Sequence, residues 1–223
     1  MSIWPTKIKA CIFDNDGTLV DSGAAYSEAH FLTTGQKQTI EIKLKLSGKT
    51  LLEGSAITVK ECNLDETPEH YAKRFEEVLE SLLPNMKLMP GVMNFLNELK
   101  KRNIKMCIAT GATDNSFRRK VENHQEMIGM MDHIVTGDHV KRGKPAPDLF
   151  LKALHKWEGI KPEEALVFED APNGVKAANN AGIPVIFIPS EKVDVEKVLK
   201  EYDAHPLMTI ESLDKFDFSQ FIW

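Results

Sequence analysis

Short runs of consecutive apolar residues recur along the chain, and each is typical of a strand buried in a parallel sheet. They cover residues 7–13, 105–110, 133–136, 165–169 and 185–188. From residue 87 onward, the segments between these runs repeat apolar residues at helical spacing, as Val92, Phe95 and Leu99 do. Strands that alternate with helices over short connections form βα units. The pattern therefore predicts an α/β fold, a Rossmann-like parallel sheet with helices on both faces.

Residues 21–86 show helical periodicity and no convincing strand. Thr67 and Pro68 are typical of a helix start, as N-cap and first helical residue. The apolar residues that follow lie on one helix face: Tyr71, Phe75, Val78, Leu79 and Leu82. We therefore expect a catalytic core, made of 1–20 and 87–223, and a small all-helical cap domain, 21–86, inserted after the first strand.

The composition is that of an ordinary globular protein, with 42% hydrophobic and 27% charged residues. A formal net charge of −5 argues against a nucleic-acid surface, and no apolar stretch is long enough to span a membrane. Cys11, Cys62 and Cys107 lie far apart and form no CxxC motif, which fits reduced thiols. We expect a cytoplasmic monomer that binds neither nucleic acid nor membranes.

Polar side chains with useful chemistry follow four of the predicted strands, at the point where each strand ends. They are Asp14 and Asp16, Thr110 and Gly111, Lys144, and Glu169 and Asp170. Each group alone has an ordinary explanation, such as a turn or a helix cap. Because the carboxyl ends of parallel strands meet at one edge of the sheet, we expect all four groups to lie together there.

These groups suit phosphoryl transfer, in which catalysis is mainly positioning and neutralisation of charge. The two carboxylates Asp14 and Asp16 could ligate a metal ion, attack an electrophile, or act as general acid and base. Mg²⁺ held by Asp14, Glu169 and Asp170 would screen these carboxylates from an anionic phosphate. Lys144 would neutralise another phosphate oxygen.

Hydrogen-bond donors for a phosphate group are available at the same strand ends. The Thr110 hydroxyl is one, and the backbone N–H groups near Asn15, Asp16 and Gly111 are the others. The sequence therefore predicts a site for a small phosphorylated molecule.

With these motifs the chain resembles a haloacid dehalogenase (HAD) superfamily phosphatase with a helical cap after the first strand. The matching segments are Asp14-Asn15-Asp16-Gly17-Thr18-Leu19, Thr110, Lys144 in Gly-Lys-Pro-Ala-Pro-Asp148, and Glu169-Asp170. The resemblance implies hydrolysis of a phosphate monoester through an aspartyl-phosphate on Asp14, with Asp16 as general acid and base. It also implies Mg²⁺ held by Asp14, the backbone carbonyl of Asp16, and Asp170. Glu169 would be a further ligand or a neighbour of the ligands.

Two segments, 166–175 and 147–151, are similar to the GS1-like branch, which includes pseudouridine-5′-phosphatase. Related enzymes act on glycerol phosphate, sugar phosphates and flavin mononucleotide, so a small phosphorylated metabolite is the implied substrate. The chain departs from the pattern at Asn15, where an apolar residue is frequent. It also has Gly111 and Ala112 where close relatives have serines. Neither departure removes a catalytic group, but each could change the substrate.

Three other functions fit part of the pattern. A β-phosphoglucomutase shares the four motifs but holds a second phosphate with a cap arginine. The corresponding loop here, 46–53, offers only Lys49, which favours a hydrolase and makes Lys49 a candidate substrate contact. A signalling receiver domain lacks the second carboxylate and the helical insertion. A catalytically silent, ligand-binding family member is disfavoured because every catalytic motif residue is present.

Two local patterns lead to further predictions. The basic run from Arg118 to Lys120 is interpreted as the solvent-facing side of a helix over 114–122. Cys11 and Cys107 each stand three residues before the terminal motif residue of their strand. We therefore predict that the two thiols lie at the same height on neighbouring strands and stay reduced.

Overall fold

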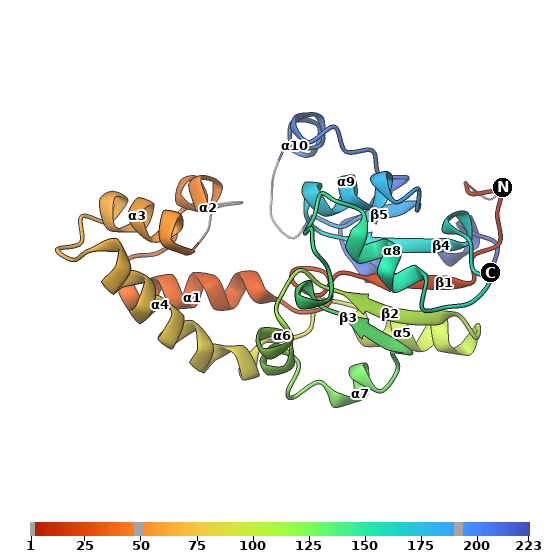
Figure 1. The fold of residues 1–223 in the computed structure, drawn as a ribbon, viewed down its shortest axis with the longest axis horizontal. Helices are drawn as coiled ribbons and strands as arrows, with labels where there is room; N and C mark the ends of the chain where they lie inside the picture. Colours follow the sequence, from red (N-terminus) through yellow and green to blue (C-terminus); the bar gives the residue numbers. More distant parts are fainter. Residues whose placement is uncertain (1–2, 47–50, 190–193) are drawn as a thin grey trace. The chain divides into compact units, whose positions relative to one another are not determined.

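The computed structural model describes residues 3–46, 51–189 and 194–223. The chain divides into two compact units (Figure 1). The core unit is Met1–Asp21 with Lys87–Trp223, and the helical unit is Ser22–Met86. Lys49, the candidate substrate contact, lies outside the described residues.

The core unit is built on a six-stranded sheet with the order β3-β2-β1-β4-β5-β6, in which every strand pair is parallel. The strands are β1 (Ala10–Phe13), β2 (Lys105–Ala109), β3 (His133–Val135), β4 (Ala165–Glu169), β5 (Val185–Phe187) and β6 (Met208–Thr209). The predicted parallel sheet is confirmed. β1 lies at its centre, and all four of its residues are buried.

Helices cover both faces of this sheet (Figure 1). One face packs on α8 (Asp148–Leu154) and α9 (Pro172–Asn180), whose apolar side chains join Ile12 and Val167 in one buried cluster. On the other face, the ring of Phe95 in α5 (Val92–Lys101) packs against two strand rings. Those rings, Phe13 and Phe168, are stacked at 5.1 Å. The remaining helices of the core unit are α6 (Asp114–Lys120), α7 (Gln125–Ile128) and α10 (Val195–Glu201).

The predicted relation between the two strand cysteines is wrong. The register pairs Ile12 with Cys107 and Cys11 with Met106. Because side chains alternate along a strand, Cys11 and Cys107 point to opposite faces of the sheet. The prediction aligned the strands by their motif residues, but the register is offset from that alignment by one residue. All three cysteines are buried and free, as expected for reduced thiols.

The helical unit consists of α1 (Ser22–Thr34), α2 (Ile40–Leu46), α3 (Leu51–Glu61) and α4 (Pro68–Leu82). Thr67 caps α4 as predicted, since its side chain accepts a hydrogen bond from the backbone N–H of His70. Arg74 ties α4 to α1, donating to the Thr33 carbonyl at 2.9 Å while it pairs with Glu66.

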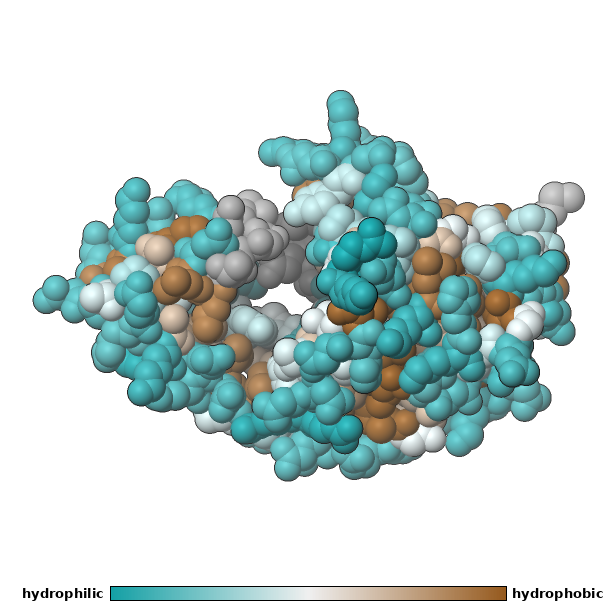
Figure 2. Space-filling model, viewed as in Figure 1, coloured by the Kyte–Doolittle hydropathy of each residue, from teal (hydrophilic) through white to brown (hydrophobic). Residues whose placement is uncertain are grey.

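Exposed apolar side chains gather mainly in the helical unit. Six of the nine large apolar residues that are exposed in the described chain belong to it: Tyr26, Phe31, Leu32, Ile40, Leu51 and Leu52. A unit this small cannot bury all of its apolar surface. Figure 2 shows hydrophilic side chains over most of the visible face, with hydrophobic ones in small patches. Among the described helices, none combines the length and apolarity that a membrane crossing needs.

The chain leaves and re-enters the core unit through two paired segments. Val20 and Leu88 form an antiparallel bridge, and the Asp21 N–H donates to the Lys87 carbonyl at 2.8 Å. The Met89 N–H donates to the Leu19 carbonyl at 2.9 Å. This pairing fixes the turn after β1 on both sides, close to the predicted site.

Candidate active site

The sheet register brings the predicted strand-end groups together. Phe13 pairs with Phe168 of β4, so Asp14 stands level with Glu169. The Asp14 N–H continues the sheet and donates to the Phe168 carbonyl at 3.0 Å. Lys144 joins both acids, since its Nζ lies 2.6 Å from Asp14 Oδ1 and 2.5 Å from Glu169 Oε1.

This triad of Lys144, Asp14 and Glu169 is almost fully buried, with side-chain exposures of 10%, 8% and 1%. Burial is the main cause that raises the pKa of Asp14 to about 7; Lys144 lowers this pKa, and the charges of Glu169 and Asp16 add to the rise. Burial alone lowers the pKa of Lys144, but its two carboxylate partners outweigh burial and raise that pKa above its usual value. The site therefore holds a permanent positive charge among carboxylates.

Both oxygens of Glu169 are engaged inside the protein. Oε1 binds Lys144, and Oε2 accepts a hydrogen bond from the Ala171 N–H at 2.7 Å. A side chain at Gly174 would collide with the Glu169 carboxylate, so α9 can approach this acid only because glycine stands there. Glu169 is therefore positioned to hold Lys144 in place.

A tight turn after β1 sets the position of the second aspartate. The Asn15 carbonyl accepts from the N–H groups of Leu19 and Val20, both at 2.9 Å. Gly17 has a φ of 81°, and a Cβ there would collide with Asp170 Oδ2. Only glycine allows the Asp170 carboxylate to lie against this turn, beside the predicted catalytic acids.

We expect Gly17→Ala to displace Asp170 and to lower any turnover that depends on it by about 10-fold or more. The matched control is Gly182→Ala, because Gly182 also has a positive φ but no atom within 4 Å of its added Cβ. Both variants should lose about 1–2 kcal/mol of unfolding free energy to backbone strain. Urea denaturation and activity assays separate the effects. Equal activities of the two variants would contradict this role of Gly17.

Thr110 and Gly111 follow β2 as predicted. The Thr110 N–H donates to the Val135 carbonyl, and its Oγ1 accepts from the Ala112 N–H at 3.1 Å, so the hydroxyl hydrogen remains available to another acceptor. Gly137 lies against this segment, a contact that the sequence did not indicate. The Gly137 N–H donates to the Ala112 carbonyl at 2.8 Å, and a side chain there would collide with the Gly111 carbonyl.

The side chain of Asn15 is fully buried and does not reach the surface of the site. Its Oδ1 and Nδ2 atoms find no hydrogen-bond partner in the described residues, and neither does Thr18 Oγ1. A substrate contact by Asn15 would therefore involve its backbone, as the sequence analysis expects.

Lys120 corrects the interpretation of the basic run on α6. Only 4% of the residue is exposed, and its Nζ lies 2.5 Å from Asp16 Oδ1. Arg118 is exposed and pairs with Asp114 at 2.7 Å. Two residues along a helix differ by about 200° in direction, so Arg118 and Lys120 point to nearly opposite sides. Within the basic run, Arg118 therefore faces solvent, whereas Lys120 faces the site.

The carboxylates of the strand-end cluster are the groups that could bind a metal ion. Within residues 3–46, 51–189 and 194–223, no group of three or more His, Cys, Asp or Glu side chains stands at metal-binding spacing. The chemistry nevertheless fits, because the carboxylates of Asp14 and Asp170 are hard oxygen ligands of the kind Mg²⁺ prefers. The absence of a side chain at Gly17 also leaves room for the Asp170 carboxylate. Burial raises the pKa of Asp14 because it disfavours the charged carboxylate, which a bound cation would stabilise.

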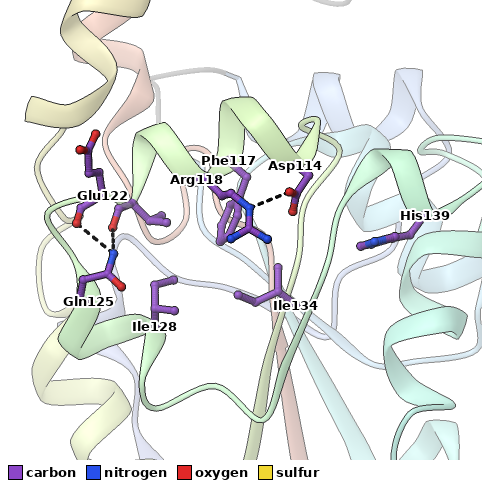
Figure 3. Close-up of a pocket in the computed structure, with 9 residues that line it drawn as sticks. Asp114, Phe117, Arg118, Glu122, Gln125, Ile128, Ile134 and His139 are labelled. Atoms are coloured by element: carbon purple, nitrogen blue, oxygen red, sulfur yellow. Dashed lines mark hydrogen bonds and ion pairs between the residues drawn. The ribbon is translucent and has the colours of Figure 1, made fainter.

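A separate cavity of about 430 Å³ lies beside α6 and contains none of the predicted site residues (Figure 3). Its lining comes from α6, α7, β3 and the turn at Gly137–His139. The Arg118 side chain points toward Asp114 along its wall. The candidate active site is therefore the strand-end cluster.

Comparison with known proteins gives concordant matches. A family model for the haloacid dehalogenase-like hydrolases matches residues 8–182. The (DL)-glycerol-3-phosphatase 2 of Arabidopsis thaliana is 36% identical over 193 residues, covering 82% of this chain and 80% of that protein. A probable pseudouridine-5′-phosphatase of Drosophila melanogaster is 34% identical over 223 residues, which cover 96% of this chain and 94% of that protein. The crystal structure of a putative beta-phosphoglucomutase from Thermotoga maritima is similar with a TM-score of 0.77 and 28% sequence identity. The match covers 93% of this chain and 96% of that protein.

Proposed function

Because this chain belongs to the haloacid dehalogenase-like hydrolase family, we propose that it is a phosphatase that hydrolyses monoesters of small phosphorylated metabolites. The single observation that supports this most directly is the buried contact of Lys144 with Asp14 at 2.6 Å, at the end of the central strand. A cation beside a carboxylate at a strand end is suited to draw a phosphate group onto that carboxylate. Glycerol phosphate and pseudouridine 5′-phosphate are the first substrates to test, since phosphatases of these names are relatives.

In the first proposed step, Asp14 attacks the phosphorus atom with Oδ2, because Oδ1 is held by Lys144. The new bond joins Asp14 to phosphorus, and the bond from phosphorus to the alcohol oxygen breaks. Asp16 gives its proton to that departing oxygen. The result is an aspartyl-phosphate and a free alcohol.

In the second proposed step, the ionised Asp16 takes a proton from water as the water oxygen bonds to phosphorus. The bond between phosphorus and Asp14 breaks, so that Asp14 returns as a carboxylate and inorganic phosphate leaves. Lys144 stays charged throughout and offsets the negative charge of the phosphate oxygens. The Thr110 hydroxyl and the Gly111 N–H are the proposed donors to the remaining phosphate oxygens.

The proposed metal ligands are the Asp14 carboxylate, the backbone carbonyl of Asp16, and the Asp170 carboxylate. Mg²⁺ bound by them would neutralise phosphate charge and orient the phosphate group. Glu169 is proposed to support Lys144 instead of binding the ion, because both of its oxygens already have partners.

A phosphosugar mutase is the second candidate, because a structure similar to this chain is described as a putative beta-phosphoglucomutase. A mutase would return the phosphoryl group to another hydroxyl of the sugar and release little inorganic phosphate. The products of glucose phosphates therefore distinguish the two functions.

The test is phosphate release from a panel of monoesters, with and without Mg²⁺. The panel contains pseudouridine 5′-phosphate, other nucleotides, glycerol phosphate, sugar phosphates and flavin mononucleotide. We expect Mg²⁺-dependent release from at least one member. Conversion of one sugar phosphate into another without release would favour the mutase. No reaction with any member would contradict the proposed function.

A further inference from the structure

Lys120 is a buried cation that the mechanism above does not use. It is the last residue of α6, and its Nζ reaches Asp16 Oδ1 at 2.5 Å across 104 residues of sequence. Its side chain is 6% exposed, whereas that of Asp16 is 27% exposed. The lysine is therefore an internal group whose ammonium lies against a carboxylate at the edge of the site.

The position of this lysine is fixed by the helix that carries it. Phe117 and Val121, on either side of Lys120 in sequence, are each only 3% exposed, and they anchor the end of α6 in the core unit. The start of α6 is fixed as well, because the Thr113 side chain accepts from the Ser116 N–H. A rigid helix thus holds the ammonium group in place.

Burying an ammonium group without a hydrogen-bond acceptor is costly, and Asp16 Oδ1 is such an acceptor whether the carboxyl group is charged or neutral. The Lys120 ammonium donates to Oδ1 of Asp16, which leaves Oδ2 as the oxygen that can carry the proton and face a substrate. An Asp side chain in solution would sample several rotamers, whereas this contact favours the one that reaches Lys120. Restricting a proton donor in this way favours the transition state only if its free oxygen points at the leaving group.

We propose that Lys120 is a positioning residue that holds the carboxyl group of Asp16 in the orientation needed for proton transfer to the leaving alcohol. The inference rests on the proposed phosphatase function, and it adds a residue that none of the four motifs contains. Only Ala112 and Thr113 separate Gly111 from the start of α6, so this short segment connects the proposed phosphate donors to the lysine that contacts the proposed proton donor.

The test compares two substrates whose leaving groups differ in their need for a proton. An alkyl phosphate, such as glycerol 3-phosphate, must expel an unstable alkoxide unless its leaving oxygen receives a proton. By contrast, 4-nitrophenyl phosphate expels a stable phenolate and needs no proton donor. The value of kcat/KM covers all steps through departure of the alcohol. For Lys120→Met we expect kcat/KM to fall about 10- to 100-fold for the best alkyl phosphate of the panel. For 4-nitrophenyl phosphate the fall should be less than about threefold.

The ratio of the two losses separates positioning from damage to the fold, because a misfolded protein loses both activities equally. Lys120→Arg, which keeps the cation, should recover part of the alkyl phosphate activity. Lys176→Met is the matched control, since Lys176 pairs with Asp203 at the same 2.5 Å but outside the site. It should leave both activities unchanged. If Lys120→Met does not fold, Lys120→Gln is judged by the same ratio.

Equal losses for the two substrates in a folded Lys120 variant, or no loss for either, would overturn the positioning role alone. A wild-type protein that hydrolyses neither substrate, nor any member of the panel, would overturn the proposed function and this inference with it. The two failures are therefore distinguishable by the behaviour of the wild type.

Discussion

Asp14→Asn is expected to lower kcat for the best substrate by at least about 10⁴-fold, because an amide cannot attack phosphorus in place of the carboxylate. The substitution keeps the size of the side chain, and burial, which raises the pKa of Asp14, already disfavours its charged form. The variant should therefore fold. Phosphate release measured at saturating substrate with Mg²⁺ gives the decrease.

The matched control for this variant is Asp203→Asn, which makes the same change at a carboxylate that pairs with Lys176 outside the site. It should retain wild-type turnover. A folded Asp14→Asn protein with more than about one hundredth of wild-type turnover would contradict the assignment of Asp14 as nucleophile.

Lys144→Met is expected to lower the free energy of unfolding by about 3–5 kcal/mol near neutral pH, as well as to remove activity. The variant leaves the buried carboxylates of Asp14 and Glu169 without their shared cation. Since the folded-state pKa of Asp14 is raised even with Lys144 present, it rises further without this lysine. A raised folded-state pKa costs stability as pH rises from the unfolded value toward the folded one. The loss should therefore be larger at about pH 8 than at about pH 5.

Urea denaturation of the wild type and Lys144→Met at both pH values measures this difference. Lys9→Met is the control, because Lys9 pairs with Glu164 at 2.6 Å while 47% of its side chain is exposed. That variant should lose less than about 1 kcal/mol at either pH. A Lys144→Met protein as stable as the wild type at about pH 8 would show that the triad does not hold buried charge.

The strand-end site could be predicted from sequence because the sheet is parallel and β1 lies at its centre. Once apolar runs mark the strands, the residues after each run must gather at one edge. The contacts of Lys144 with Asp14 and Glu169 show this gathering, although 130 residues separate Lys144 from Asp14. The family resemblance added the individual roles, which the spacing of residues alone does not give.

Lys120 and Gly137 could not be predicted because their roles depend on three-dimensional packing. Lys120 belongs to a basic run, and only the direction of each side chain on α6 separates it from Arg118. Gly137 matters through its close approach to the Gly111 carbonyl, which no sequence pattern marks. The prediction for the strand cysteines was wrong for a related reason, since a one-residue change in register moves a side chain to the other face of the sheet.

The most direct test of the central claim, that Asp14 is the residue phosphorylated during turnover, is chemical trapping of the intermediate. The protein is mixed with its best substrate and Mg²⁺, quenched with borohydride during turnover, digested, and analysed by mass spectrometry. Borohydride reduces an aspartyl-phosphate to homoserine, so the account predicts homoserine at position 14, only when substrate is present. An unmodified Asp14 in a protein that is turning over substrate, or homoserine at another aspartate, would contradict it.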